Sequence, residues 1–114
     1  MNKHYDLEER TLKFTRAVIE FLNKVPKNLT NLEIAKQLFR SAGSVGANYI
    51  EANESLSKKD FIMRIKICKK EAKESRYWLK LTSGNEQDED ARTILIQECI
   101  ELMKIFGAIL EKTK

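Results

Sequence analysis

Residues 31–54 read NLEIAKQLFRSAGSVGANYIEANE, and their apolar residues recur at spacings of three and four. That spacing is the period of one face of an α-helix, whereas a half-buried strand would alternate apolar and polar residues. Thr30 and Glu33 stand at capping-box spacing just before the pattern, which predicts a helix start. The stretch therefore predicts a long amphipathic helix over about 31–54. Its expected core face consists of Ile34, Leu38, Ala42, Val45, Tyr49 and Ala52.

The same period recurs in three other segments of the chain. One predicted helix covers about 7–24 and ends ahead of Pro26, which cannot continue a helix. Ser57 and Asp60 repeat the capping-box spacing in front of a helix at about 58–81. A run of acidic residues precedes the last helix, at about 87–112, where negative charge suits the positive end of a helix dipole.

Four amphipathic helices joined by short connections bury their apolar faces most simply in one another. The expected fold is all-α, an antiparallel up-down-up-down four-helix bundle that forms a single domain over residues 1–114. The composition agrees, because 114 residues with only one proline and four glycines, 33% charged and 42% hydrophobic, are typical of long helices and not of disordered chains.

The sequence also bears on the compartment. The longest stretch without a charge, residues 41–50, is too short and too polar to span a bilayer, which needs about 20 apolar residues. The first ten residues lack the apolar stretch of a secretory signal. We therefore expect a cytoplasmic protein without membrane contact. Cys68 and Cys99 fall among apolar helical positions and are expected as reduced, buried thiols in preference to disulfide partners or metal ligands.

An enzymatic function finds little support in the residues. A di-iron site in a helical bundle needs Glu-x-x-His pairs on facing helices, but the one histidine is His4, close to the amino terminus. No Gly-rich phosphate loop occurs, and neither cysteine has an evident activating base. We expect no enzymatic activity, no cofactor and no metal.

The two C-terminal predicted helices carry apolar residues outside their core faces. One bundle core can hardly cover these second strips, and monomers seldom leave a large apolar patch in water. Self-association is the expected explanation, and the alternative is a wide face buried within one chain, which weighs more for the last helix. The candidate oligomer-interface residues are Met63, Ile67, Trp78, Leu81, Ile96, Ile100 and Met103.

The helix at 31–54 contains two features that need an explanation. Gly43 and Gly46 each cost about 1 kcal/mol relative to alanine inside a helix, so we expect another backbone to approach closely at both. Polar residues also line up beside the core face, where we expect interhelical hydrogen bonds and ion pairs. This polar stripe consists of Glu33, Gln37, Arg40, Ser44, Asn48 and Glu51.

Positive charge is concentrated in the third predicted helix. The net charge is +4, but residues 57–85 hold nine Lys/Arg against three Asp/Glu, and residues 86–114 hold four against seven. On a helical wheel the cations fall within a sector of about 120°, together with Tyr77, as in a ridge that contacts phosphates. The alternative is an ordinary solvated row of charges. The nucleic-acid-binding candidates are Lys59, Lys66, Lys69, Lys70, Lys73, Arg76 and Lys80.

A DNA-binding helix-turn-helix is the rival interpretation of residues 32–50. Their apolar and small residues echo the spacing of that motif. The motif usually has a glycine that breaks its first helix, whereas this chain has Phe39 and Arg40 and its apolar pattern continues without interruption. We therefore expect one continuous helix and reject the helix-turn-helix.

Four segments carry a resemblance to a known family. They are Glu9-Arg10-Thr11-x-x-Phe14; Gln37-Leu38-x-Arg40-Ser41-Ala42-x-Ser44-Val45-x-Ala47-Asn48-x-x-Glu51-Ala52; Lys59-Asp60-Phe61; and Glu74-Ser75-x-Tyr77-Trp78-Leu79. In this order they resemble the bacterial four-helix-bundle family known as the 23S ribosomal RNA intervening-sequence proteins. The resemblance covers nearly the whole chain, and the last helix contributes least to it.

The resemblance implies a left-handed up-down bundle that assembles as a ring, commonly a homopentamer. It also implies a gene inside an intervening sequence of a large-subunit ribosomal RNA gene. Similar proteins serve as accessory factors in diversity-generating retroelements, where they bind nucleic acid and a reverse transcriptase through a basic surface. No catalytic residue carries over.

Residues and resemblance together lead to two functional hypotheses. The first is a non-enzymatic, oligomeric nucleic-acid-binding protein that binds structured RNA, or DNA, through the basic face of the helix at 58–81. The second is a protein-interaction scaffold without a nucleic-acid role, in which the basic face only keeps the protein soluble.

Overall fold

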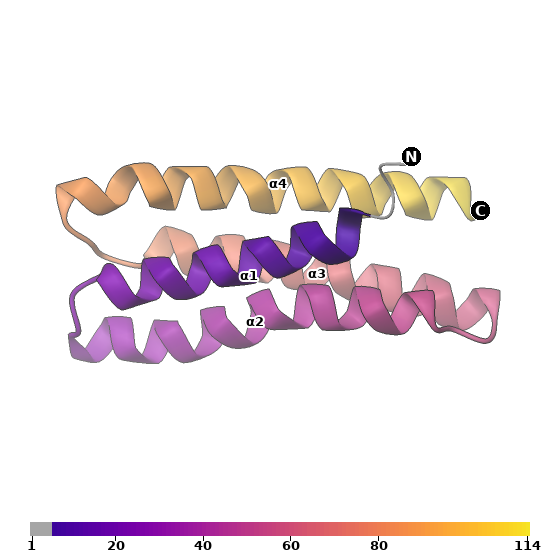
Figure 1. Cartoon of the computed structure of the whole chain (residues 1–114), viewed down its shortest axis with the longest axis horizontal. Helices are drawn as coiled ribbons and strands as arrows, with labels where there is room; N and C mark the ends of the chain where they lie inside the picture. Colours follow the sequence, from indigo (N-terminus) through magenta and orange to yellow (C-terminus); the bar gives the residue numbers. More distant parts are fainter. Residues whose placement is uncertain (1–5) are drawn as a thin grey trace.

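The computed structural model of this chain describes residues 6–114. They form four α-helices and one short 3-10 turn: α1 (Asp6–Lys24), α2 (Leu29–Asn53), α3 (Lys58–Leu81), η2 (Glu86–Asp88) and α4 (Glu89–Lys112). Successive helices run antiparallel, as Figure 1 shows, and α4 also packs against α1. The predicted all-α four-helix bundle is confirmed. Within the described residues, no helix combines the length and the apolar content that crossing a bilayer requires.

Local capping explains where α2 and α3 begin. Ser57 caps α3, since its Oγ accepts a hydrogen bond from the backbone N–H of Asp60 at 3.1 Å, as predicted. The N-cap of α2 is Asn28, whose Oδ1 accepts from the N–H of Asn31 at 2.8 Å. The predicted capping box of Thr30 with Glu33 is therefore wrong, because Thr30 already lies in the first turn. Asparagine is at least as good an N-cap as threonine, so the helix starts two residues earlier than predicted.

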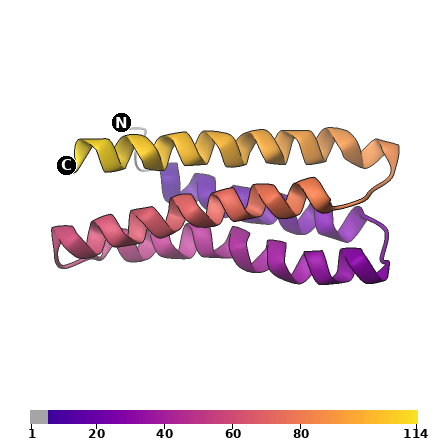
Figure 2. The same cartoon turned by 180° about the vertical axis from the view of Figure 1, so that it is seen from behind.

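The core draws on all four helices and is centred on α3. Its largest fully buried side chains include Val18, Leu38, Ile65, Leu102 and Phe106. The interfaces of α3 with α2 and with α4 are the most extensive in the bundle, and the interface of α1 with α4 is the smallest among neighbouring helices. Seen from behind in Figure 2, α3 lies between α2 and α4. The face of α3 opposite the core is consequently open to solvent.

A single buried side chain joins the two loops at one end of the bundle. Asn31 is only 3% exposed, and its Nδ2 donates to the carbonyl of Pro26 at 2.9 Å and to that of Ser83 at 2.7 Å. Its Oδ1 accepts from the N–H of Ser83 at 3.2 Å. The α1–α2 loop and the α3–α4 loop, which lie at the same end in Figure 1, are therefore held together by one amide.

The two glycines of α2 differ in their surroundings. A Cβ added at Gly46 would lie 3.0 Å from Thr11 Oγ1, so α1 approaches closely there, as predicted. Among residues 6–114, nothing lies within 4 Å of a Cβ added at Gly43. The predicted close approach at Gly43 is therefore not made within this part of the chain.

Alanine substitution at the two glycines is expected to change stability in opposite directions. Gly43→Ala should raise the free energy of unfolding by about 0.5–1 kcal/mol, because alanine restricts the unfolded chain and has room here. Gly46→Ala should lower it by about 1–2 kcal/mol, because buried Thr11 is held by its hydrogen bond to the carbonyl of Leu7 and cannot move aside cheaply. Urea denaturation of the two variants measures both effects. A loss of stability in Gly43→Ala would contradict the open surroundings of that glycine.

Candidate nucleic-acid interface

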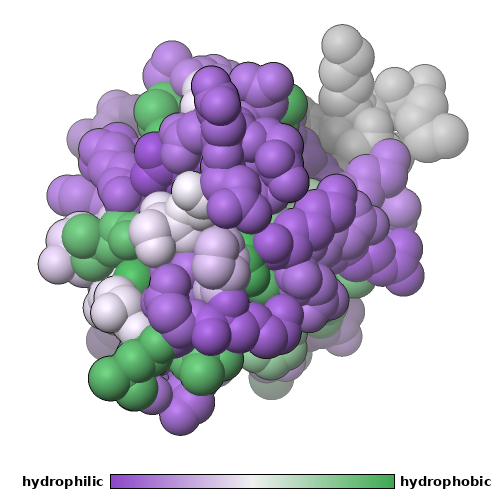
Figure 3. Space-filling view, turned by 90° about the vertical axis from the view of Figure 1, so that its left-hand side faces the viewer, coloured by the Kyte–Doolittle hydropathy of each residue, from purple (hydrophilic) through white to green (hydrophobic). Residues whose placement is uncertain are grey.

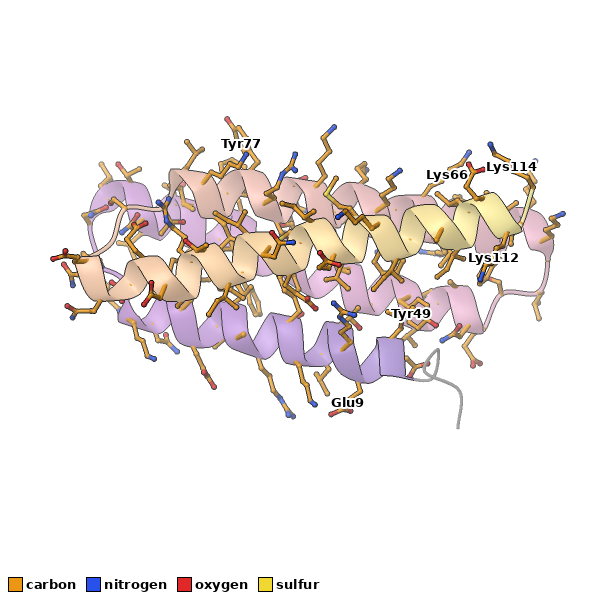
Figure 4. The ribbon with its side chains drawn as sticks, turned by 90° about the horizontal axis from the view of Figure 1, so that it is seen from above. Glu9, Tyr49, Lys66, Tyr77, Lys112 and Lys114 are labelled. Carbon is orange, nitrogen blue, oxygen red and sulfur yellow. The ribbon has the colours of Figure 1, made fainter. Side chains whose placement is uncertain are left out.

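The seven predicted nucleic-acid-binding residues lie on the open face of α3. The six lysines are exposed, and Arg76 is half-buried. The core residues Cys68 and Leu79 of the same helix are fully buried on the opposite side. Figure 4 shows Lys66 and Tyr77 projecting from the outer edge of α3, away from the other helices. The structure thus brings the predicted cations together as one surface, the α3 basic face.

Two carboxylates of α3 are bound by α2 beside the α3 basic face. Glu71 and Glu74 lie on the side of α3 that packs against α2, where Arg40 contacts Glu71 Oε1 at 3.4 Å and hydrogen-bonds to Glu74. Trp78 Nε1 also donates to Glu74 Oε2 at 3.0 Å. These bonds from Trp78 and Arg40 hold the pKa of Glu74 below its usual value. Arg40 therefore offsets part of the negative charge of Glu71 and Glu74, and the exposed side of α3 carries more cations than carboxylates.

None of the seven cations forms an ion pair with a carboxylate among the side chains that the structure describes. The ion pairs that do occur involve other residues, such as Arg10 with Glu98 and Arg92 with Glu89. Cations that form no ion pair within the chain keep their positive potential available to an external anion. The α3 basic face therefore meets the electrostatic requirement for contacts with phosphates.

Part of the polar stripe of α2 joins α2 to α3, as expected. Arg40 reaches Glu71 and Glu74 on α3. Asn48 Oδ1 accepts from Arg64 Nη1 of α3 at 3.0 Å, and Asn48 Nδ2 donates to Ser44 Oγ at 2.8 Å. Glu33 pairs with Lys36 of its own helix, and Gln37 and Glu51 are exposed.

Residues of the family-like segments mostly hold helices together. Arg10 forms a double hydrogen bond with Glu98, with both N···O distances 2.8 Å, and so joins α1 to α4. The hydroxyls of Ser41 and Ser75, both fully buried, lie 2.8 Å apart and join α2 to α3. These contacts give Arg10, Ser41 and Ser75 a role in joining the helices.

The candidate oligomer-interface residues divide into two groups. Met63 and Leu81 are 47% and 49% exposed and face solvent. The others are half-buried, and three of them, Trp78, Ile96 and Met103, pack against the core. Packing within one chain thus accounts for much of the strip on α4, as the alternative expectation held. Contact of these residues with a second copy stays a prediction.

An apolar surface on α1 and α2 was not predicted from the sequence. Leu29 is 82% exposed and Phe39 55% exposed, and both line a groove of about 570 Å³ together with Ile19 and Leu32. We call these four residues the α1–α2 strip. Figure 3 views the end of the bundle that carries the α1–α2 and α3–α4 loops and shows hydrophobic side chains reaching the surface there. The seven-residue spacing of Leu32 and Phe39 was the available signal, since it places both on one helix face outside the core.

The two cysteines are buried thiols with a raised pKa. Cys68 and Cys99 are free and fully buried, and burial raises the pKa of each thiol to about 12. A raised pKa keeps both thiols protonated at neutral pH, which disfavours nucleophilic chemistry. Among the described residues, no group of three or more His, Cys, Asp or Glu side chains could hold a metal ion. His4 lies outside the described residues.

Comparisons with known proteins agree with this architecture. The model of a family described as "23S rRNA-intervening sequence protein" matches residues 3–108. No curated protein matches the chain. A crystal structure of a protein with unknown function from the S23 ribosomal protein family of Bacteroides thetaiotaomicron is similar, with 28% sequence identity and a TM-score of 0.74. The match covers 90% of this chain and 96% of that one.

Proposed function

Because this chain belongs to the 23S rRNA-intervening sequence protein family, we propose that it is a non-enzymatic, cytoplasmic protein that binds structured RNA through the α3 basic face. One observation carries the proposal. Seven cations share one helix face and form no ion pair among the described side chains, while Glu71 and Glu74 of the same helix are bound to Arg40 of α2. Such a face favours a partner with repeated negative charge, and a nucleic-acid backbone provides it.

The geometry favours contacts with phosphates over contacts with base edges. Lys59, Lys66, Lys73 and Lys80 recur every seven residues, which places them about 10.5 Å apart along the helix. Flexible lysines in such a row neutralise a backbone but carry little sequence information. Tyr77 is 57% exposed beside them and offers a ring on which a splayed base could stack. The proposed binding therefore depends mainly on electrostatic attraction and has little sequence specificity.

The proposal includes assembly into a homo-oligomer, with a pentamer as the form that the resemblance implies. The α1–α2 strip supports it, because the chain leaves Leu29, Phe39 and their neighbours in solvent. Exposed Met63 and Leu81 on α3 add to the apolar surface that water disfavours. An assembly would also bring several α3 basic faces together and strengthen the field that attracts RNA.

A protein-interaction scaffold is the second candidate function. The groove at the α1–α2 strip favours it, because an open apolar groove between two helices suits the apolar face of a partner helix. On this account the α3 basic face would contribute only to solubility.

Titration of the nuclease-treated protein into a fluorescently labelled hairpin RNA over a salt series tests the leading proposal. Light scattering first establishes the size of the assembly. We expect log affinity to fall linearly with log salt concentration, with a slope of roughly −0.7 to −0.9 for each phosphate contacted. Absent or salt-independent binding would contradict the RNA-binding proposal and leave the scaffold. A monomer in light scattering at working concentration would contradict the proposed assembly.

A further inference from the structure

A shallow groove runs between α3 and α4 beside the α3 basic face. Its volume is about 280 Å³. Two cations of α3 and one of α4 surround three apolar residues of α4, and the lining contains no carboxylate. The lining residues are Lys69, Arg76, Ile100, Met103, Lys104 and Gly107.

The charges around this groove call for an anionic occupant. Lys69 and Arg76 are seven residues apart and therefore lie on one side of α3, while Lys104 faces them from α4. None of the three forms an ion pair with a carboxylate in the described part of the chain. Like charges around one hollow repel one another, and a bound phosphate would convert that repulsion into attraction.

The floor of the groove is apolar and kept open by a glycine. A Cβ added at Gly107 would lie 3.5 Å from Lys69 Nζ, so the ammonium of Lys69 reaches across the glycine. Ile100 and Met103 remain half-buried beside it and leave apolar surface accessible. A flat aromatic ring could rest on this surface while its attached phosphate meets the cations.

We infer that the α3–α4 groove binds a single unpaired nucleotide of the RNA, with its phosphate among Lys69, Arg76 and Lys104 and its base against Ile100 and Met103. The inference rests on the proposed function and adds a ligand class to it. It assigns Ile100 and Met103 to this groove and not to the interface between copies, for which the exposed Met63 and Leu81 and the α1–α2 strip remain. Bases inside an A-form duplex are stacked and cannot present a face to the protein, whereas unpaired bases can be splayed out. The groove is close to the smallest ligand pockets, of roughly 300 Å³, so it suits one nucleotide.

The test compares a blunt RNA duplex with the same duplex carrying one bulged adenosine, by fluorescence anisotropy at fixed salt. We expect the wild-type protein to bind the bulged RNA about tenfold more tightly. Gly107→Leu fills the floor without changing any charge, and leucine favours the helix. It should abolish the preference and change duplex binding by no more than about twofold, because Lys69 can turn toward solvent and all seven cations of the α3 basic face are retained. Ala108→Leu is the matched control, since Ala108 is exposed and does not line the groove, and it should retain the preference.

The outcomes separate this inference from the proposed function. Equal binding of both RNAs by the wild type, or a preference that survives Gly107→Leu, would overturn the nucleotide site while the α3 basic face still binds RNA. Failure to bind either RNA would overturn the proposed function and the groove with it.

Discussion

Changing Lys69, Lys70, Lys73, Arg76 and Lys80 to glutamate is expected to weaken RNA binding by roughly a hundredfold or more at low salt. Each substitution removes a cation from the α3 basic face and adds a repulsive charge. The slope of log affinity against log salt should also become shallower, by up to about one for each phosphate that the variant no longer neutralises. Because none of the five residues belongs to the buried core or pairs with a described carboxylate, the helical content should be retained in circular dichroism.

A second variant controls for overall charge. Lys13, Arg16, Lys24, Lys27 and Lys36 are exposed cations of α1, α2 and the loop between them. Changing these five to glutamate alters the net charge by the same amount as the first variant but leaves the α3 basic face intact. We expect the control to lose several-fold in affinity at most, since distant charges are screened over about 10 Å at moderate salt. Similar losses in both variants would show that binding depends on the overall charge, and would contradict a dedicated binding face on α3.

The helices were predictable because their signals are local. The signals used act within one or two turns of helix; they are the hydrophobic period, the Ser57 cap and Pro26. As a result, α3 begins and ends at the predicted residues. The start of α2 was not predictable to the residue, because Asn28 and Thr30 are both good caps. Asn31 is buried between the two loops through its bonds to Pro26 and Ser83, and Ser83 lies 52 residues away. A pattern among neighbouring residues cannot predict that contact.

In the candidate site, too, local patterns predict some features and miss others. The α3 basic face followed from helix period alone, since lysines are almost never fully buried without a partner. The groove could not be predicted from helix period, because it depends on how α3 and α4 are aligned. That alignment places Lys104 and Gly107 opposite Lys69. The pairing of Arg40 with Glu74, which engages a carboxylate of α3, likewise depends on the alignment of α2 with α3. Both residues belong to the family-like segments, so part of that similarity reflects helix packing.

Asn31→Leu is expected to lower the free energy of unfolding by about 2–3 kcal/mol. Leucine is similar in size but cannot donate to the carbonyls of Pro26 and Ser83 or accept from the N–H of Ser83. Leaving such partly buried groups without partners costs about 1–3 kcal/mol each where water cannot reach them, and some water will enter at the loops. Urea denaturation monitored by circular dichroism measures the loss, which should appear as a lower midpoint with an unchanged slope.

Asn53→Leu makes the same chemical change at the other end of α2 and serves as the control. Asn53 is exposed, and its hydrogen bond to Glu8 Oε2 at 2.9 Å lies in solvent, so its loss should cost about 0.5 kcal/mol or less. The difference between the variants isolates the burial of Asn31, because residue type, helix and substitution are the same. If both variants lose equally little, water replaces the Asn31 bonds without cost, and the two loops would be held by the packing of α2 against α3 and not by this amide.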